Sequence, residues 1–327
     1  MHADSTFPPA RLRVGGTVLS LIAGPLTVSI LRAHLDGPLR LPDLRERIGG
    51  AAQTTLRGQV GNLRGIGALE RRVVGGMPYT VENELTDAGR AVLGVADSVE
   101  RWLARAPQGA IALGSEPAKG AIRALVGGWG STMLRALAAR PLSLTELSSV
   151  INDHSYPAIE RRLSGMRAAR LVEPHPDGER GAKPYTVTEW ARQAIGPLAA
   201  AGRCECEHMA NSAEPLARLD IEAGFLLAVP LLDLEVTRNG PCLLAVDTGG
   251  GRVGESNDRL AGVQVQIEEG AVVSCVSRLE RDPRTWVLGA VDAWVDAILD
   301  GSLTRLRLGG MDPKLAEAIV AKLHSAL

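Results

Sequence analysis

The stretch ILRAHLDGPLRLPDL at residues 30–44 recurs as MLRALAARPLSLTEL at residues 133–147. The two copies align without a gap, and the second begins 103 residues after the first. The same register continues downstream, where LRGQVGNLRGIGALE at 56–70 aligns with IERRLSGMRAARLVE at 159–173. Self-similarity over such a distance indicates one structural unit that is present twice.

Two shorter motifs extend the repeat beyond this stretch. PYTV occurs at 78–81 and at 184–187, a separation of 106, which predicts three extra residues before this motif in the second copy. LTDAGR at 85–90 resembles VTEWAR at 187–192. We therefore expect two copies of one unit to occupy residues 12 to 208.

The apolar spacing within a copy predicts three helices, a β-hairpin and a closing helix. Leu56, Val60 and Leu63 recur at i, i+4 and i+7, which places them on one face of the third helix. RRVV and PYTV are typical of two short strands, and Gly75-Gly76 predicts a two-residue turn between them. Three helices followed by a hairpin form a winged helix, whose third helix enters the DNA major groove.

The first copy resembles the HxlR-type winged-helix transcriptional regulators. The segments that carry the resemblance follow one another in the order ILRAHLDGPLRLPDLRERIGG, TLRGQVGNLRGIGALERRV, PYTVENELTDAGRAVL and SVERWL. The resemblance implies that double-stranded DNA is a partner. Some members sense redox state through a cysteine near the first helix, and this chain has none there.

Polar and basic residues that would face outward are the candidate DNA contacts, because arginines, hydroxyls and amides reach phosphates and base edges. In the first copy they are Gln53, Thr54, Thr55, Arg57, Arg64, Arg71 and Arg72, and in the second Ser155, Tyr156, Arg161, Arg162, Arg167, Arg180 and Lys183. The alternative interpretation is that they form ordinary solvated helix faces. Glu160 of the second copy would repel phosphate, so the first copy is expected to recognise DNA better.

The chain changes character after His208. GFLLAVPLLDLEV and PCLLAVDT are predicted strands, and AGVQVQIEEGAVVSCVSRL is predicted to form two strands that turn at Glu269-Gly270. Asp282-Pro283 predicts the start of a helix that carries Trp286 and Trp294 on one face, two turns apart. Asp312-Pro313 predicts the start of the last helix. These elements favour an α+β domain.

This C-terminal part resembles the sterol-carrier-protein type 2 fold in the order of RTWVLGAVDAWVDAILDGSLTRLRLGGMDPKLAEAIV. The resemblance implies a sheet and helices that can enclose an apolar ligand. The residues expected to line such a pocket are Phe225, Leu232, Leu234, Leu244, Val273, Cys275, Trp286 and Trp294. The alternative is that these residues are core only.

The expected architecture is therefore a multidomain α+β protein. We predict a first winged-helix domain at 12–106, a linker at 107–122, a second winged helix at 123–209 and a sterol-carrier-like domain at 210–327. Residues 11–105 hold 13 arginines and nine acidic residues, whereas residues 211–327 hold 11 basic and 17 acidic residues. The basic N-terminal part and the acidic C-terminal part are therefore expected to have different partners.

Weaker patterns point to no metal, cofactor or catalytic chemistry. CECEH at 204–208 would bring three ligands together only if a helix ended within it. Gly249, Gly251 and Gly254 fit a dinucleotide motif, but no amphipathic helix follows them. The sequence has no apolar run long enough for a membrane span and no signal-peptide pattern at its start. We expect a cytoplasmic, non-enzymatic protein without cofactors.

These features together predict a transcriptional regulator, with repression expected rather than activation. Double-stranded DNA and an apolar small-molecule effector are the expected partners. Two winged helices on one chain would allow a monomer to act as a pseudo-dimer, and a homodimer is the alternative. The competing functional hypothesis is a lipid-binding or natural-product-binding protein whose winged helices mediate protein contacts.

Overall fold

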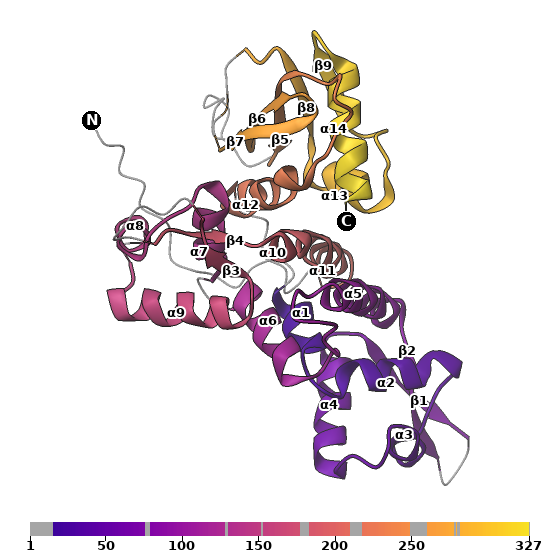
Figure 1. Cartoon of the computed structure of the whole chain (residues 1–327). Helices are drawn as coiled ribbons and strands as arrows, with labels where there is room; N and C mark the ends of the chain where they lie inside the picture. Colours follow the sequence, from indigo (N-terminus) through magenta and orange to yellow (C-terminus); the bar gives the residue numbers. More distant parts are fainter. Residues whose placement is uncertain are drawn as a thin grey trace. The chain divides into compact units, whose positions relative to one another are not determined.

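The structure, a computed structural model, describes residues 16–75, 79–127, 130–151, 153–176, 183–209, 218–248, 260–277, 279 and 282–326 (Figure 1). The described chain divides into two compact units. An N-terminal unit consists of residues in Val14–Arg123 and Ala200–Glu214, and a C-terminal unit consists of those in Ala124–Ala199 and Pro215–Leu327. The division falls inside two helices, α6 (Glu116–Val126) and α11 (Ile195–His208).

The first repeat copy folds as helices followed by a hairpin and a long helix. Leu56, Val60 and Leu63 are buried, so the predicted inner face of the third helix is confirmed. Burying each such aliphatic side chain contributes roughly 1.5–3 kcal/mol. The elements are α1 (Gly16–Ile22), α2 (Thr27–Ala33), η1 (His34–Asp36), α3 (Leu41–Arg47), α4 (Gln53–Gly65), β1 (Leu69–Val74), β2 (Thr80–Leu85) and α5 (Asp87–Ala104).

The hairpin of this copy is longer than predicted. Strands β1 and β2 are antiparallel, and their last pair toward the loop is Val74 with Thr80. Residues 75–79 therefore connect the strands, and the predicted two-residue turn at Gly75-Gly76 is wrong. Of this connection, the structure describes only Gly75 and Tyr79.

The described elements of the second copy follow the same order of helices, hairpin and closing helix, but the closing part is divided into two helices and no 3-10 helix is among them. Helix α8 begins 103 residues after α3, and α9 begins 103 residues after α4. Helix α6 starts at Glu116, inside the segment predicted as a linker. The elements are α6 (Glu116–Val126), α7 (Gly130–Ala139), α8 (Leu144–Val150), α9 (Tyr156–Ala168), β3 (Val172–Pro174), β4 (Tyr185–Val187), α10 (Glu189–Gln193) and α11 (Ile195–His208).

Strand pairing corrects the alignment of the two hairpins. Leu69 pairs with Leu85 in the first hairpin, and Val172 pairs with Val187 in the second. One residue more lies between Leu69 and Leu85 than between Val172 and Val187. The PYTV motifs therefore do not occupy equivalent positions, and the prediction of three extra residues in the second copy is wrong. The LTDAGR and VTEWAR motifs do correspond, because the Oγ1 atoms of Thr86 and Thr188 each cap the following helix.

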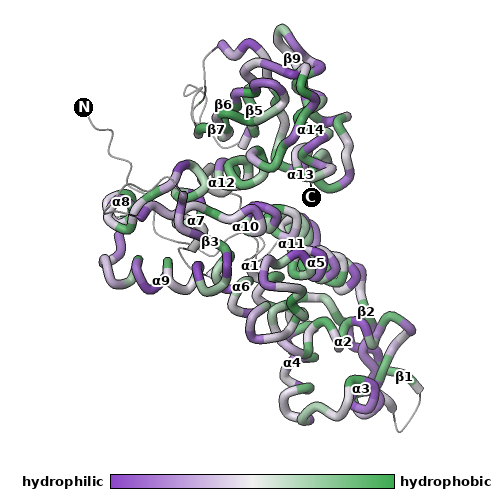
Figure 2. The backbone as a smooth tube through the Cα atoms, in the orientation of Figure 1, coloured by the Kyte–Doolittle hydropathy of each residue, from purple (hydrophilic) through white to green (hydrophobic). Residues whose placement is uncertain are grey.

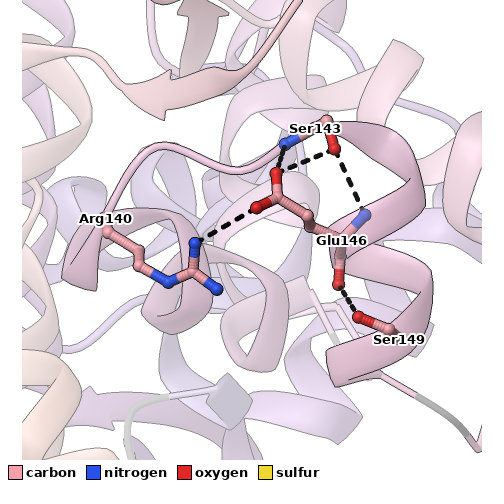
Figure 3. Close-up of polar contacts among 4 residues, drawn as sticks. All are labelled: Arg140, Ser143, Glu146 and Ser149. Carbon is pink, nitrogen blue, oxygen red and sulfur yellow. Dashed lines mark hydrogen bonds and ion pairs between the residues drawn. The ribbon is translucent and has the colours of Figure 1, made fainter. Parts of the chain in front are cut away.

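Helix α8 begins at a capping box (Figure 3). The Ser143 hydroxyl accepts a hydrogen bond from the Glu146 amide at 3.3 Å, and the Glu146 carboxylate accepts one from the Ser143 amide at 2.8 Å. Arg140 lies 3.3 Å from the same carboxylate. Bonds from the Ser143 amide and hydroxyl, followed by the Arg140 contact, lower the pKa of Glu146. The arrangement satisfies backbone donors that a helix start leaves free.

The C-terminal part is a mixed five-stranded sheet with three helices, in the strand order β7-β6-β5-β8-β9. Among the strand pairs that the structure describes, only β5–β8 is parallel. Glu269 and Gly270, at φ 49° and 81°, form the predicted turn between β6 and β7. The elements are α12 (Arg218–Ala228), η2 (Val229–Leu231), β5 (Gly240–Asp247), β6 (Leu260–Glu268), β7 (Ala271–Val276), β8 (Thr285–Ala290), α13 (Val291–Asp300), β9 (Arg307–Gly310) and α14 (Pro313–Ser325).

Two predicted elements of this part are wrong. GFLLAVPLL was expected to be a strand but forms the end of α12 and η2, and this end of α12 is hydrophobic (Figure 2). Asp282-Pro283 begins no helix, and Trp286 lies on strand β8. The prediction at Asp312 is confirmed, because its carboxylate accepts a hydrogen bond from the Leu315 amide at 2.9 Å and caps α14.

Among the described helices, none is by itself long and apolar enough to cross a membrane. Helices α1 and α2, the latter taken together with η1, reach that length and composition only as a pair, and the chain bends by 82° between them.

Candidate nucleic-acid interface

Helix α4 presents a polar face because its three apolar residues all point into the core. Its first three residues carry an amide and two hydroxyls at the helix start, where side chains of a recognition helix approach base edges. Every candidate contact of the first copy is exposed: Gln53, Thr54, Thr55, Arg57, Arg64, Arg71 and Arg72. The fold therefore brings the predicted set to one helix and one hairpin strand.

Three arginines of this set make no ion pair within the part of the chain that the structure describes. They are Arg57, Arg64 and Arg71. Arg72 lies 3.3 Å from Glu84 across the hairpin, and the two side chains are 57% and 36% exposed. An exposed pair of this kind contributes only about 0–1 kcal/mol, so a phosphate could replace the carboxylate.

Three other arginines of the N-terminal unit are engaged by carboxylates. Arg32 lies 2.7 Å from Glu100, and hydrogen bonding to that carboxylate raises the pKa of Arg32. Arg40 lies 2.7 Å from Asp43, which raises the pKa of Arg40, and Arg47 is paired as well. Among the described arginines of α2–β2, Arg57, Arg64 and Arg71 of α4 and β1 therefore lack a carboxylate partner, as does Arg45 of α3, which donates to the Ala51 carbonyl instead.

The second copy offers a sparser surface on α9. Ser155, Tyr156 and Arg161 are exposed, and the Ser155 side chain makes no capping bond to the backbone. Arg167 is exposed but lies over the Tyr185 ring, 5.3 Å from its centroid. Lys183 is exposed as well. Arg180 lies outside the described residues.

Arg162 does not belong with these exposed side chains. Its guanidinium donates hydrogen bonds to the carbonyl oxygens of Ala124 and Gly127. The period of the helix turns Arg162 toward α6 while Arg161 is exposed, so the structure does not bring Arg162 together with the other predicted contacts.

The predicted ligand-lining residues mostly form core. Phe225, Leu232, Leu234, Leu244 and Trp294 are buried. Phe225 meets Trp294 edge to face, with centroids 4.8 Å apart, and the Trp294 Nε1 donates to the Ala245 carbonyl at 2.8 Å. This contact joins α12, α13 and β5.

Three other members of that set are placed differently. Val273 is 53% exposed on the edge strand β7, so it lines no enclosed pocket, and Cys275 is half-buried. Trp286 lies across Gly309 of β9, where an added Cβ would come within 2.4 Å of the indole.

The two tryptophans lie on opposite faces of the sheet. Trp294 covers the side of β8 on which Gly289 lies, and Trp286 lies an odd number of residues away on the same strand. The prediction that they border one cavity is therefore wrong.

CECEH lies in α11 and does not form a three-ligand site in the structure. Cys204 is buried, and burial raises the pKa of its thiol to about 11, whereas Cys206 is exposed. Within the described ranges no group of three His, Cys, Asp or Glu side chains could hold a metal ion. The glycines at 249, 251 and 254 lie outside those ranges.

Residues 21–108 match the HxlR-like helix-turn-helix family. The HxlR-like segment contains α2 to α5 and every candidate contact of the first copy, and it ends before α6. No curated protein matches the chain. The HxlR-like match supports assignment as a DNA-binding transcriptional regulator.

Proposed function

We propose that this regulator binds double-stranded DNA through two winged-helix modules, with α4 as the principal reader in the major groove. The observation that carries the proposal is the exposed face of α4, whose Arg57 and Arg64 are uncompensated within the described residues and lie inside the HxlR-like segment. Two turns separate these arginines, so both can approach one stretch of phosphate backbone.

The second module, α6 to α11, is proposed as a weaker reader. Its support is the recurrence of element order and of the 103-residue spacing at α8 and α9. Fewer of its cations are available, since Arg162 is bound to carbonyls and Glu160 is exposed on the same helix. Two unequal modules on one chain fit a DNA site with two unlike halves.

Binding is tested by fluorescence anisotropy on duplexes from the region upstream of the protein's own coding sequence, at several salt concentrations. Affinity should fall steeply with salt, and Arg64→Gln should lower the magnitude of the log–log slope by about one unit. Arg101→Gln in α5, an exposed arginine outside the proposed interface, is the matched control. Absence of specific binding would favour the protein-contact alternative.

The ranking of the modules has its own test. Replacing Gln53, Thr54 and Thr55 by Ala should reduce discrimination between the preferred and an unrelated duplex, because base contacts carry specificity. Replacing Ser155 and Tyr156 by Ala should reduce it less. A larger loss from the second pair would reverse the ranking.

We further propose that the C-terminal sheet domain is sterol-carrier-like and senses an apolar small molecule. What supports coupling to DNA is α12, which packs against both β6 and α7. Glu222 of α12, with a side chain 4% exposed, lies 3.1 Å from Arg135 of α7 and accepts a hydrogen bond from Ser277 at 2.8 Å. Arg192 of α10 donates to the Leu226 carbonyl at 2.7 Å.

A ligand that shifts α12 would thus act directly on two helices of the second module, and coupling between the two sites is reciprocal. The test uses the apolar dye 1-anilinonaphthalene-8-sulfonate as the probe and screens apolar metabolites for its displacement. A true effector should raise the melting temperature and change DNA affinity by the same factor as DNA changes effector affinity. A reporter assay then distinguishes the expected repression from activation.

The coupling variant is Ser277→Ala, which removes one bond to Glu222 without stripping the buried carboxylate of its arginine. It should reduce the factor by which an effector changes DNA affinity. Arg32→Gln is the control. Arg32 is the residue of the first module that corresponds to Arg135 at the 103-residue spacing, but it pairs with carboxylates of α5 and not with α12. If an effector changed DNA affinity by the same factor in both variants, α12 would not transmit the effect of the ligand to the second module.

A further inference from the structure

Arg162 lies in the middle of α9 yet is turned away from that helix's exposed arginines. One guanidinium nitrogen donates to the Ala124 carbonyl at 3.2 Å and also to the Gly127 carbonyl. The residue is half-buried, whereas Arg161 beside it is exposed. Ala124 lies in the last turn of α6, and Gly127 directly follows its last residue, Val126.

The end of α6 is a site that attracts a cation. The last four carbonyls of a helix have no intrahelical donor, and Ala124 is among them because α6 ends at Val126. These carbonyls also carry the partial negative charge of the helix dipole. Desolvation lowers the pKa of Arg162, but a guanidinium keeps its charge at neutral pH. Arg162 therefore makes charge-assisted bonds in a partly desolvated place, where they are strongest.

The first module lacks this contact. The residue 103 positions before Arg162 is Gln59 of α4, which is half-buried and makes no side-chain hydrogen bond within the part of the chain that the structure describes. The substitution Arg162→Gln therefore gives the second module the residue type that the first module has at the corresponding position of its helix.

We propose that Arg162 is a positioning residue for DNA recognition: it fixes α9 to the last turn of α6 and so sets the angle at which α9 presents Ser155, Tyr156 and Arg161. This inference rests on the proposed DNA-binding function. It separates two neighbouring arginines by role, since Arg161 would contact phosphate and Arg162 would not.

DNA binding provides the first test, with full-length Arg162→Gln, Arg162→Lys and Arg161→Gln compared by anisotropy across salt concentrations. Arg162→Gln should weaken binding about tenfold at every salt concentration without changing the salt slope, because no phosphate contact is lost. Arg162→Lys should stay near wild type, since an ammonium also donates to carbonyls. Arg161→Gln should lower the magnitude of the slope by about one unit. A lowered slope for Arg162→Gln would make Arg162 a phosphate contact and overturn the proposal.

Hydrogen exchange on the free protein provides the second test, which needs no DNA. Arg162→Gln should speed amide exchange about tenfold in the last turn of α6 and in α9, whereas Arg161→Gln should leave both unchanged. Unaltered exchange in Arg162→Gln would overturn the proposal even if the chain binds DNA. If the wild-type chain binds no DNA while exchange responds as expected, the proposed function fails and the attachment of α9 to α6 stands.

Discussion

At the residue scale, His34 makes the first module sensitive to pH. The ring is 1% exposed, and desolvation lowers its pKa below the ordinary value of 6.5. The unfolded chain therefore binds a proton more readily than the folded one, so stability falls as pH decreases from about 7.5 through 6.5. We expect a lower melting temperature at pH 5.5 than at pH 7.5, with a smaller difference in His34→Gln. An equal difference in both proteins would show that other groups cause it.

At the element scale, the two copies start corresponding helices by different means. Helix α8 has the Ser143–Glu146 capping box, whereas Arg40, the residue before the first turn of α3, caps no backbone group with its side chain. Ser143→Ala should lower the free energy of unfolding of the C-terminal unit by about 1 kcal/mol, measured by urea titration. Arg40→Ala is the control, and it should cost less because its exposed pair with Asp43 contributes little. The reverse order would mean that the box adds no stability.

At the scale of the whole molecule, the sheet domain and the second module stabilise each other. A chain that ends at His208 loses α12, which carries the Glu222 partner of Arg135 and the Leu226 carbonyl bound by Arg192. It also uncovers the apolar side of α7. We therefore expect the second module of the truncated chain to unfold at a lower temperature than in the full chain, followed by circular dichroism and by hydrogen exchange of the amides in α7 and α10. An unchanged transition would show that the module is independent.

The sequence by itself determined the features that depend on local order. The spacing of Leu56, Val60 and Leu63 defined both faces of α4, and hence the exposed candidate residues, because helical periodicity is a property of neighbouring residues. Asp312-Pro313 marked the start of α14, and Glu269-Gly270 marked a turn, for the same reason. Because the two copies align at a spacing of 103 residues, the helix starts of the first copy also indicated where α8 and α9 begin.

Only the tertiary structure decided the features that depend on distant partners. An apolar run such as GFLLAVPLL suits a buried helix or a buried strand equally, and packing of α12 between β6 and α7 settled it. Trp286 joined a strand because β8 pairs with β5 and β9, which are remote in sequence. Arg161 and Arg162 are the same residue type and neighbours in the sequence, yet of the two the carbonyls at the end of α6 bind Arg162. Hydrogen bonding and burial between distant segments assign these roles, and no local pattern records them.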